Sequence, residues 1–145
     1  MARKTKPKKR AGVVRERNAG TMSEAEFRSF IISALRDRTK WWKPITRTKA
    51  AARVKPGIYK CEKCWKEWPE HSPPPPWKKR RTKNFAVDHR IPIVGKEGFQ
   101  SYDLWIERAF IEQGKGLRLL CKECHDEKTK IERAEARAYK LKQKK

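Results

Sequence analysis

Apolar residues near the start of the chain recur with a helical period. Over residues 21–38, "TMSEAEFRSFIISALRDR", the large apolar side chains fall at helical spacing and form one face. That face comprises Phe27, Phe30, Ile31, Ala34 and Leu35. We expect it to pack in a core. Ser23 followed by Glu26, or Thr21 followed by Glu24, fits a capping box at the start of this helix.

The pattern of the remaining chain is shorter and partly strand-like. It predicts a helix over 45–54, two short strands around a turn over 58–68 and an extended loop over 70–83. A strand or hairpin arm over 84–94 and a helix over 101–111 follow. The last predicted elements are a short strand over 117–120 and a charged helix over 125–145. The loop is expected to be extended because its four consecutive prolines cannot lie inside a helix or a sheet. The pattern as a whole predicts a small α+β fold.

The charge of the chain points to a polyanionic partner. Lys and Arg total 39 of the 145 residues against 17 Asp and Glu, a net charge of +22. We therefore expect nucleic acid as the partner, DNA or RNA, alone or in a nucleoprotein complex. A membrane is not expected, because the chain has no long apolar run and its basic segments lack an apolar face. The basic start "MARKTKPKKR" has no hydrophobic stretch after it, which favours an intracellular protein.

We expect four segments along the chain. They are a basic flexible arm over 1–20, a helical segment over 21–56, a zinc-bound domain over 57–135 and a basic tail over 136–145. Only 37% of the residues are hydrophobic, so the core must be small and needs reinforcement.

The four cysteines of the chain provide that reinforcement. They form two pairs of identical spacing, Cys61 with Cys64 and Cys121 with Cys124. Two such turns can close a tetrahedron of thiolates around Zn²⁺. A zinc ion with four thiolate ligands has no open position for chemistry, so the sequence predicts a structural zinc site.

The segment between the cysteine pairs contains a candidate for catalysis, "VDHRIP". Adjacent residues of a strand point to opposite faces, so Asp88 can bind an ion while His89 faces a substrate. His125, directly after the last cysteine, can supply a second ligand to that ion. A partly open divalent metal beside a histidine base suits phosphodiester hydrolysis.

The order of these motifs resembles the HNH endonuclease family. "CEKC", "VDHRIPIV" and "LLCKECHDEKT" are similar to the small zinc-bound HNH proteins of bacteriophages, over about residues 59–131. The resemblance implies a ββα-metal unit that cuts or nicks DNA with Mg²⁺ or another divalent ion. It implies metal binding by Asp88 and His125 and a general-base role for His89. It also implies a phage-encoded protein in the host cytoplasm, and some phage members are implicated in genome packaging.

One family position differs. The family has an asparagine five residues before the third cysteine, which is thought to brace the active-site loop and to orient the histidine. Here the residue is Gly116. A second interpretation is therefore a non-catalytic zinc protein that binds nucleic acid or a nucleoprotein. A third is a zinc-stapled adaptor for a packaging or transcription protein, which would dock on the apolar helix near residues 27–35.

Nucleic-acid contacts are expected from the loop "PPPPWKKRR". It places the indole of Trp77 before four cations that an extended loop can project toward phosphates. The predicted contact residues are Trp77, Lys78, Lys79, Arg80, Arg81, Arg90 and Lys128.

Overall fold

The computed structural model describes residues 12–74 and 76–143. The chain divides after Asp37 into two compact units. Most of the predicted basic arm, residues 1–11, and the last two residues of the predicted tail lie outside the described residues.

The first unit contains a tight turn and most of helix α1, Glu24–Thr39. The capping box is made by Ser23 and Glu26: the Ser23 N–H donates to Glu26 Oε2 at 2.8 Å, and the Glu26 N–H donates to Ser23 Oγ at 3.3 Å. Glu24 forms an ion pair with Arg17 instead. No residue of α1 is buried, so the expectation that its apolar face packs in a core is not met.

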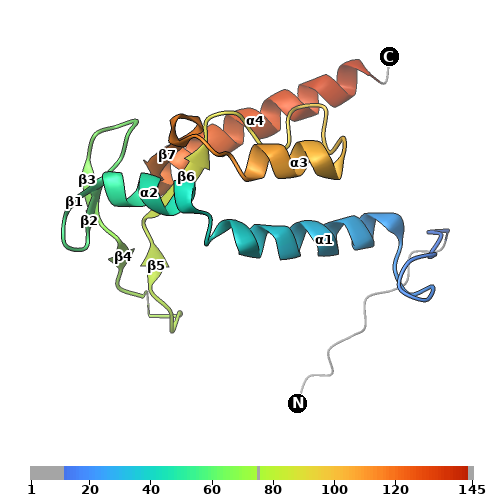
Figure 1. Cartoon of the computed structure of the whole chain (residues 1–145), viewed down its shortest axis with the longest axis horizontal. Coiled ribbons are helices and arrows are strands. Elements are labelled where there is room, and N and C mark those ends of the chain that lie inside the picture. Colours follow the sequence, from blue (N-terminus) through green and yellow to red (C-terminus); the bar gives the residue numbers. More distant parts are fainter. Residues whose placement is uncertain (1–11, 75, 144–145) are drawn as a thin grey trace. The chain divides into compact units, whose positions relative to one another are not determined.

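The second unit is mixed α+β (Figure 1). It contains α2 (Lys43–Ala51), α3 (Tyr102–Ala109), a 3-10 turn (Gly114–Gly116) and α4 (Lys122–Lys142), together with β1 (Arg53–Lys55), β2 (Ile58–Lys60), β3 (Glu67–Pro69), β4 (His71–Ser72), β5 (Thr82–Lys83), β6 (Phe85–His89) and β7 (Leu117–Cys121). The strands form three antiparallel sheets, β1-β2-β3, β4-β5 and β6-β7.

Three boundaries differ from the sequence prediction. The second helix begins with Pro44 in its first turn, where a missing N–H costs nothing, and it ends at Ala51 because the following residues form β1. The predicted loop over 70–83 carries the two-residue strands β4 and β5, so Pro73, Pro74 and Pro76 lie in the connection between two paired strands. Helix α4 begins at Lys122, three residues earlier than predicted, and this places Cys124 and His125 inside the helix.

The pairing of β6 with β7 fixes the faces on which the candidate residues lie. Phe85 pairs with Cys121, Asp88 with Arg118 and His89 with Leu117, and α4 follows β7 directly. Directly paired residues share a face and adjacent residues do not. Asp88 therefore faces α4, whereas His89 points to the other face. Both α2 and α4 contact this pair of strands.

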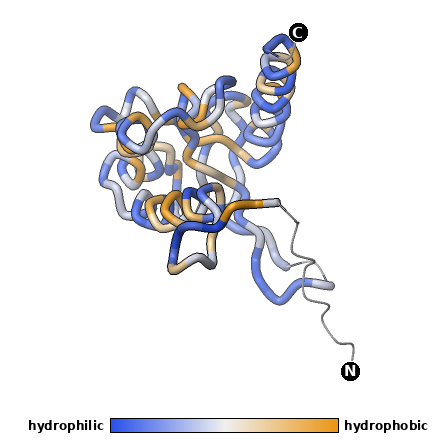
Figure 2. The backbone as a smooth tube through the Cα atoms, turned by 90° about the vertical axis from the view of Figure 1, so that its right-hand side faces the viewer, coloured by the Kyte–Doolittle hydropathy of each residue, from blue (hydrophilic) through white to orange (hydrophobic). Residues whose placement is uncertain are grey.

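Sulfur atoms occupy the centre of the small core. Cys61, Leu120, Cys121 and Cys124 form one buried cluster, with Trp68 among the partly buried side chains packed on it. Figure 2 shows that α4 is hydrophilic along most of its length, so this helix adds little to the core. Among the described helices, none is both long and apolar enough to cross a membrane.

We expect Leu120→Ala to lower the free energy of unfolding by about 2–5 kcal/mol, because Leu120 is completely buried in this cluster. Chemical denaturation followed by circular dichroism measures the change. Leu141→Ala, at an exposed position of α4, is the matched control and should change stability by less than about 0.5 kcal/mol. Equal effects of the two substitutions would contradict the assignment of the core.

Candidate functional site

The four cysteines come together from two distant segments. Cys61 and Cys64 lie on the turn after β2, Cys121 ends β7, and Cys124 lies in the first turn of α4. All four Sγ atoms lie within 4.8 Å of one another, and Cys64 Sγ is 3.8 Å from Cys121 Sγ. The cluster could hold a metal ion and is compatible with structural zinc, as the sequence predicted.

The surroundings of the sulfurs favour negative charge on one of them. Burial raises the pKa of Cys61, but hydrogen bonds from backbone N–H groups outweigh it and lower this pKa to about 7. One of these donors is the Cys121 N–H, 3.3 Å from the sulfur. Burial and the neighbouring cysteine sulfurs raise the pKa of Cys124 to about 12. Four ionised thiols in this space therefore require a bound cation, and a metal ion that binds here displaces their protons.

Backbone hydrogen bonds hold the first cysteine turn in place. The Cys61 N–H donates to the Lys66 carbonyl, and the Trp65 N–H donates to the Cys61 carbonyl. The Glu62 N–H donates to the Leu119 carbonyl at 2.9 Å, which fixes the turn to β7. The register of the cysteine turn against the second pair is thus set by the main chain.

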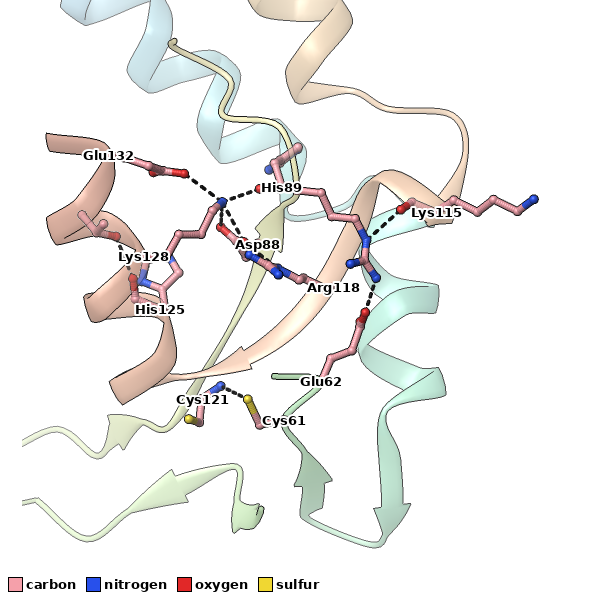
Figure 3. A network of polar contacts seen from close by, with 12 residues as sticks. Cys61, Glu62, Asp88, His89, Lys115, Arg118, Cys121, His125, Lys128 and Glu132 are labelled. Atoms are coloured by element: carbon pink, nitrogen blue, oxygen red, sulfur yellow. Dashed lines mark hydrogen bonds and ion pairs between the residues drawn. The ribbon is translucent and has the colours of Figure 1, made fainter. Parts of the chain in front are cut away.

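The carboxylate of Asp88 is buried and bound by two cations (Figure 3). Lys128 Nζ lies 2.9 Å from Oδ1 and 2.8 Å from Oδ2, and Arg118 Nε lies 3.1 Å from Oδ2. Lys128 also donates to the His89 carbonyl and lies 3.0 Å from Glu132 Oε1. The ammonium group is therefore surrounded by oxygen atoms from β6 and α4.

This arrangement bears directly on the predicted second metal. Carboxylate and imidazole groups such as those of Asp88 and His125 can bind a divalent ion. In this structure the ammonium group of Lys128 lies against the Asp88 carboxylate, where such an ion would bind. His125 lies in the second turn of α4, with Nδ1 3.9 Å from Asp126 Oδ1. Within residues 12–74 and 76–143, the cysteine cluster is the only group of three or more ligand side chains close enough to hold a metal. A divalent ion at Asp88 would have to displace Lys128 from this carboxylate. Lys128 could then keep its ion pair with Glu132.

His89 is oriented by the end of α3. Its Nε2 lies 3.1 Å from the carbonyl oxygen of Ala109, the last residue of that helix. Carbonyls in the last turn of a helix lack an intrahelical partner, so the ring N–H satisfies one of them. In this tautomer Nε2 donates and Nδ1 keeps a lone pair that can accept a proton.

The loop before β7 is braced by Arg90. The Arg90 N–H donates to the Gly116 carbonyl at 2.9 Å, and its Nε donates to the Lys115 carbonyl at 3.0 Å. The same guanidinium forms an ion pair with Glu62 on the cysteine turn. Arg90 thus supports the loop that carries Gly116, where the resemblance to the HNH family would place an asparagine.

Gly116 leaves no room for such an asparagine without local movement. A Cβ atom at this position would lie 2.9 Å from Cδ1 and 3.2 Å from Cγ2 of Ile111. The isoleucine side chain therefore fills the space beside the loop.

An open groove leads to His89 on the face opposite Asp88. Its volume is about 480 Å³, and it is lined by parts of α2, β5, β6 and the segments beside them. Its charged or basic lining residues are Lys40, Lys49, Glu70, Lys83 and His89. Lys49 hydrogen-bonds to Glu70, which lowers the pKa of Glu70. No sequence pattern pointed to the three lysines, because they lie far apart along the chain.

The predicted nucleic-acid contacts divide into exposed and internal residues. Trp77 is 80% exposed, and Lys78, Lys79, Arg80 and Arg81 are exposed beside it in the β4–β5 hairpin. The Arg90 guanidinium is engaged by Glu62 and the Lys115 carbonyl, and the Lys128 side chain is only 16% exposed. These last two cations hold the site together and have internal partners that compete with phosphate.

A further basic surface was missed from the sequence. Lys130, Arg133, Arg137 and Lys140 repeat every three or four residues, and all four are exposed on α4. They line one open surface depression together with Ala136. The helical spacing was visible in the sequence and could have identified this basic stripe.

Comparisons of the chain with protein-family models, with curated proteins and with solved structures found no match.

We expect the purified protein to carry one metal ion per chain on the cysteine cluster, and Cys121→Ser to lose it. Elemental analysis after gel filtration measures the metal content. Cys64→His is the matched variant, because imidazole is also a metal ligand, and it should retain more metal than Cys64→Ser. Full metal content in Cys121→Ser would contradict the four-cysteine site.

Proposed function

We propose that the chain is a metal-dependent, HNH-like DNA endonuclease or nickase in which His89 is the general base. The observation that carries this proposal is the bond between His89 Nε2 and the Ala109 carbonyl. It gives the histidine a fixed orientation and tautomer although Gly116 occupies the position of the family asparagine. The base is therefore held by another element of the same chain.

The groove beside His89 supports a phosphodiester as the substrate. Lys40, Lys49 and Lys83 line the same groove as the ring. Their positive charges attract a phosphate backbone toward the histidine, although Glu70 already pairs with Lys49 and competes with phosphate there. Nδ1 of His89 then takes the proton from a water molecule that attacks the phosphorus.

The proposal assigns Asp88 and His125 to a catalytic divalent ion, Mg²⁺ or another. Such an ion would supply stabilisation of negative charge on the phosphate and on the leaving oxygen. Because Asp88 and His89 point to opposite faces of β6, the cleaved phosphate would have to lie at the end of this strand to meet both the ion and the base. Lys128 competes for the same carboxylate, so we expect divalent ions to bind this site more weakly than a site with no resident cation.

For the cysteine cluster we propose Zn²⁺ in a purely structural role. Four thiolate ligands leave no position for water or substrate. The ion would join the cysteine turn to the junction of β7 and α4, and so fix the strand that carries Arg118 and the helix that carries His125 and Lys128.

The wider setting is also part of the proposal. The motifs resemble those of small phage proteins, which supports a phage-encoded protein that acts in the host cytoplasm. On the same ground we propose a packaging or transcription protein as a partner.

A second candidate function is supported by the ion pair between Lys128 and Asp88. A resident ammonium on the predicted metal ligand favours a protein that has kept the zinc-bound scaffold and nucleic-acid binding but not the chemistry. Gly116 favours the same interpretation. This protein would bind DNA, RNA or a nucleoprotein.

Incubation with supercoiled plasmid and Mg²⁺, Mn²⁺ or Ni²⁺ separates the two functions. We expect nicked or linear product only with added metal, and at least about 100-fold slower cleavage by His89→Ala, because the base is lost. Asp88→Ala should also suppress cleavage while the cysteine-bound metal is retained. His71→Ala, on β4, is the matched control and should cleave like the wild type.

Two results would contradict the nuclease. Binding of DNA with no cleavage under any of the metals would favour the second function. Cleavage that survives His89→Ala would show that another group is the base.

The basic surfaces can be ranked by the salt dependence of binding. Alanine at Lys78, Lys79, Arg80 and Arg81 should reduce the slope of log affinity against log salt, by up to about one unit for each DNA phosphate that the variant no longer neutralises. The same replacement at Lys130, Arg133, Arg137 and Lys140 is a variant that removes an equal charge. If the slope of log affinity against log salt stays unchanged in the hairpin variant but falls in the α4 variant, the phosphate binding belongs to α4.

A further inference from the structure

Trp65 occupies an unusual position on the first cysteine turn. It directly follows Cys64, its side chain is 65% exposed, and its backbone is left-handed, with φ of 61°. Only three described residues other than glycine have a positive φ, and Trp65 is the bulkiest of them. Large side chains disfavour this conformation, whereas glycine adopts it without strain.

The fold uses the backbone of Trp65 and not its indole. The Trp65 N–H closes the turn by donating to the Cys61 carbonyl at 2.9 Å. Any residue with an N–H could make this bond. The exposed ring contributes little to the core, so packing does not explain why a strained position carries the largest side chain.

One cation lies over the indole, and two more belong to the same turn. Lys60 Nζ lies 5.3 Å from the centre of the ring, and Lys66, the next residue along the chain, is exposed. Lys63, in the same turn, is held by Glu127. The ring thus has a cation over one face and leaves its other face for a ligand, on a turn that the main chain and the cysteine cluster hold in place.

We propose that Trp65 is a binding site for an unpaired nucleobase of a single-stranded nucleic acid. The base stacks on the indole while Lys60 and Lys66 contact the neighbouring phosphates. A duplex covers the faces of its bases, so the site selects unpaired nucleotides. This inference rests on the nucleic-acid substrate proposed above and adds the strandedness of the segment bound at the cysteine turn.

Fluorescence anisotropy with a labelled 20-nucleotide oligothymidine and a labelled 20-base-pair duplex tests the site in the full-length, metal-loaded protein. We expect Trp65→Gly to weaken binding of the single strand roughly 5- to 150-fold, the range that corresponds to one stacked base. Duplex affinity should change by less than about threefold. Trp65→Phe should retain most of the affinity, and Trp41→Ala, at another exposed tryptophan, should behave like the wild type.

A stability measurement separates binding from a structural role. Trp65→Gly relieves the left-handed strain, so its metal content should be unchanged and its melting temperature equal to or above that of the wild type. Weaker binding together with a reduced metal content or a lower melting temperature would assign Trp65 to the fold and overturn the proposal.

The remaining outcomes are also decisive. Unchanged single-strand affinity in Trp65→Gly, or equal weakening for both probes, would overturn the site, whatever the cleavage assay shows. A wild type that binds neither probe would overturn it too and assign the ring to a protein surface. Loss of single-strand binding in Trp65→Gly without any plasmid cleavage by the wild type would support this site and reject only the nuclease.

Discussion

The second unit depends on the convergence of four sulfur atoms. Its completely buried side chains are few, and the core cluster consists of Leu120 and three of the cysteines. These sulfurs join the turn after β2 to the junction of β7 and α4. A metal ion held there would replace apolar burial as the main link between these segments and would help a chain with so much positive charge to remain compact.

The position of the candidate site follows from that link. Glu62 lies between the first two cysteines and pairs with Arg90, and Arg90 in turn holds the carbonyls of Lys115 and Gly116. The cysteine turn is thereby connected to the loop beside His89. The cysteine cluster and His89 are thus joined by one bonded network, although they lie toward opposite ends of the β6–β7 ladder.

The sequence was sufficient for features that depend on local spacing. The capping box at Ser23, the two cysteine pairs and the opposite faces of Asp88 and His89 each follow from a few neighbouring residues. The partners of the site residues could not be predicted, because they come from distant segments: Ala109 for His89, and Lys128 with Arg118 for Asp88. Lys128 was expected to face a phosphate, and the sequence contains nothing that distinguishes an exposed lysine from one that a buried carboxylate captures.

The ion pair of Lys128 with Asp88 has a consequence for how the protein responds to its ionic environment. Lys128 and Arg118 already neutralise the buried carboxylate of Asp88. The contact between β6 and α4 therefore has no uncompensated charge when a second metal is absent. Under the nuclease proposal, a shortage of free divalent ions would then silence the protein while leaving it folded. Activity would rise again with ion concentration, without any need for refolding.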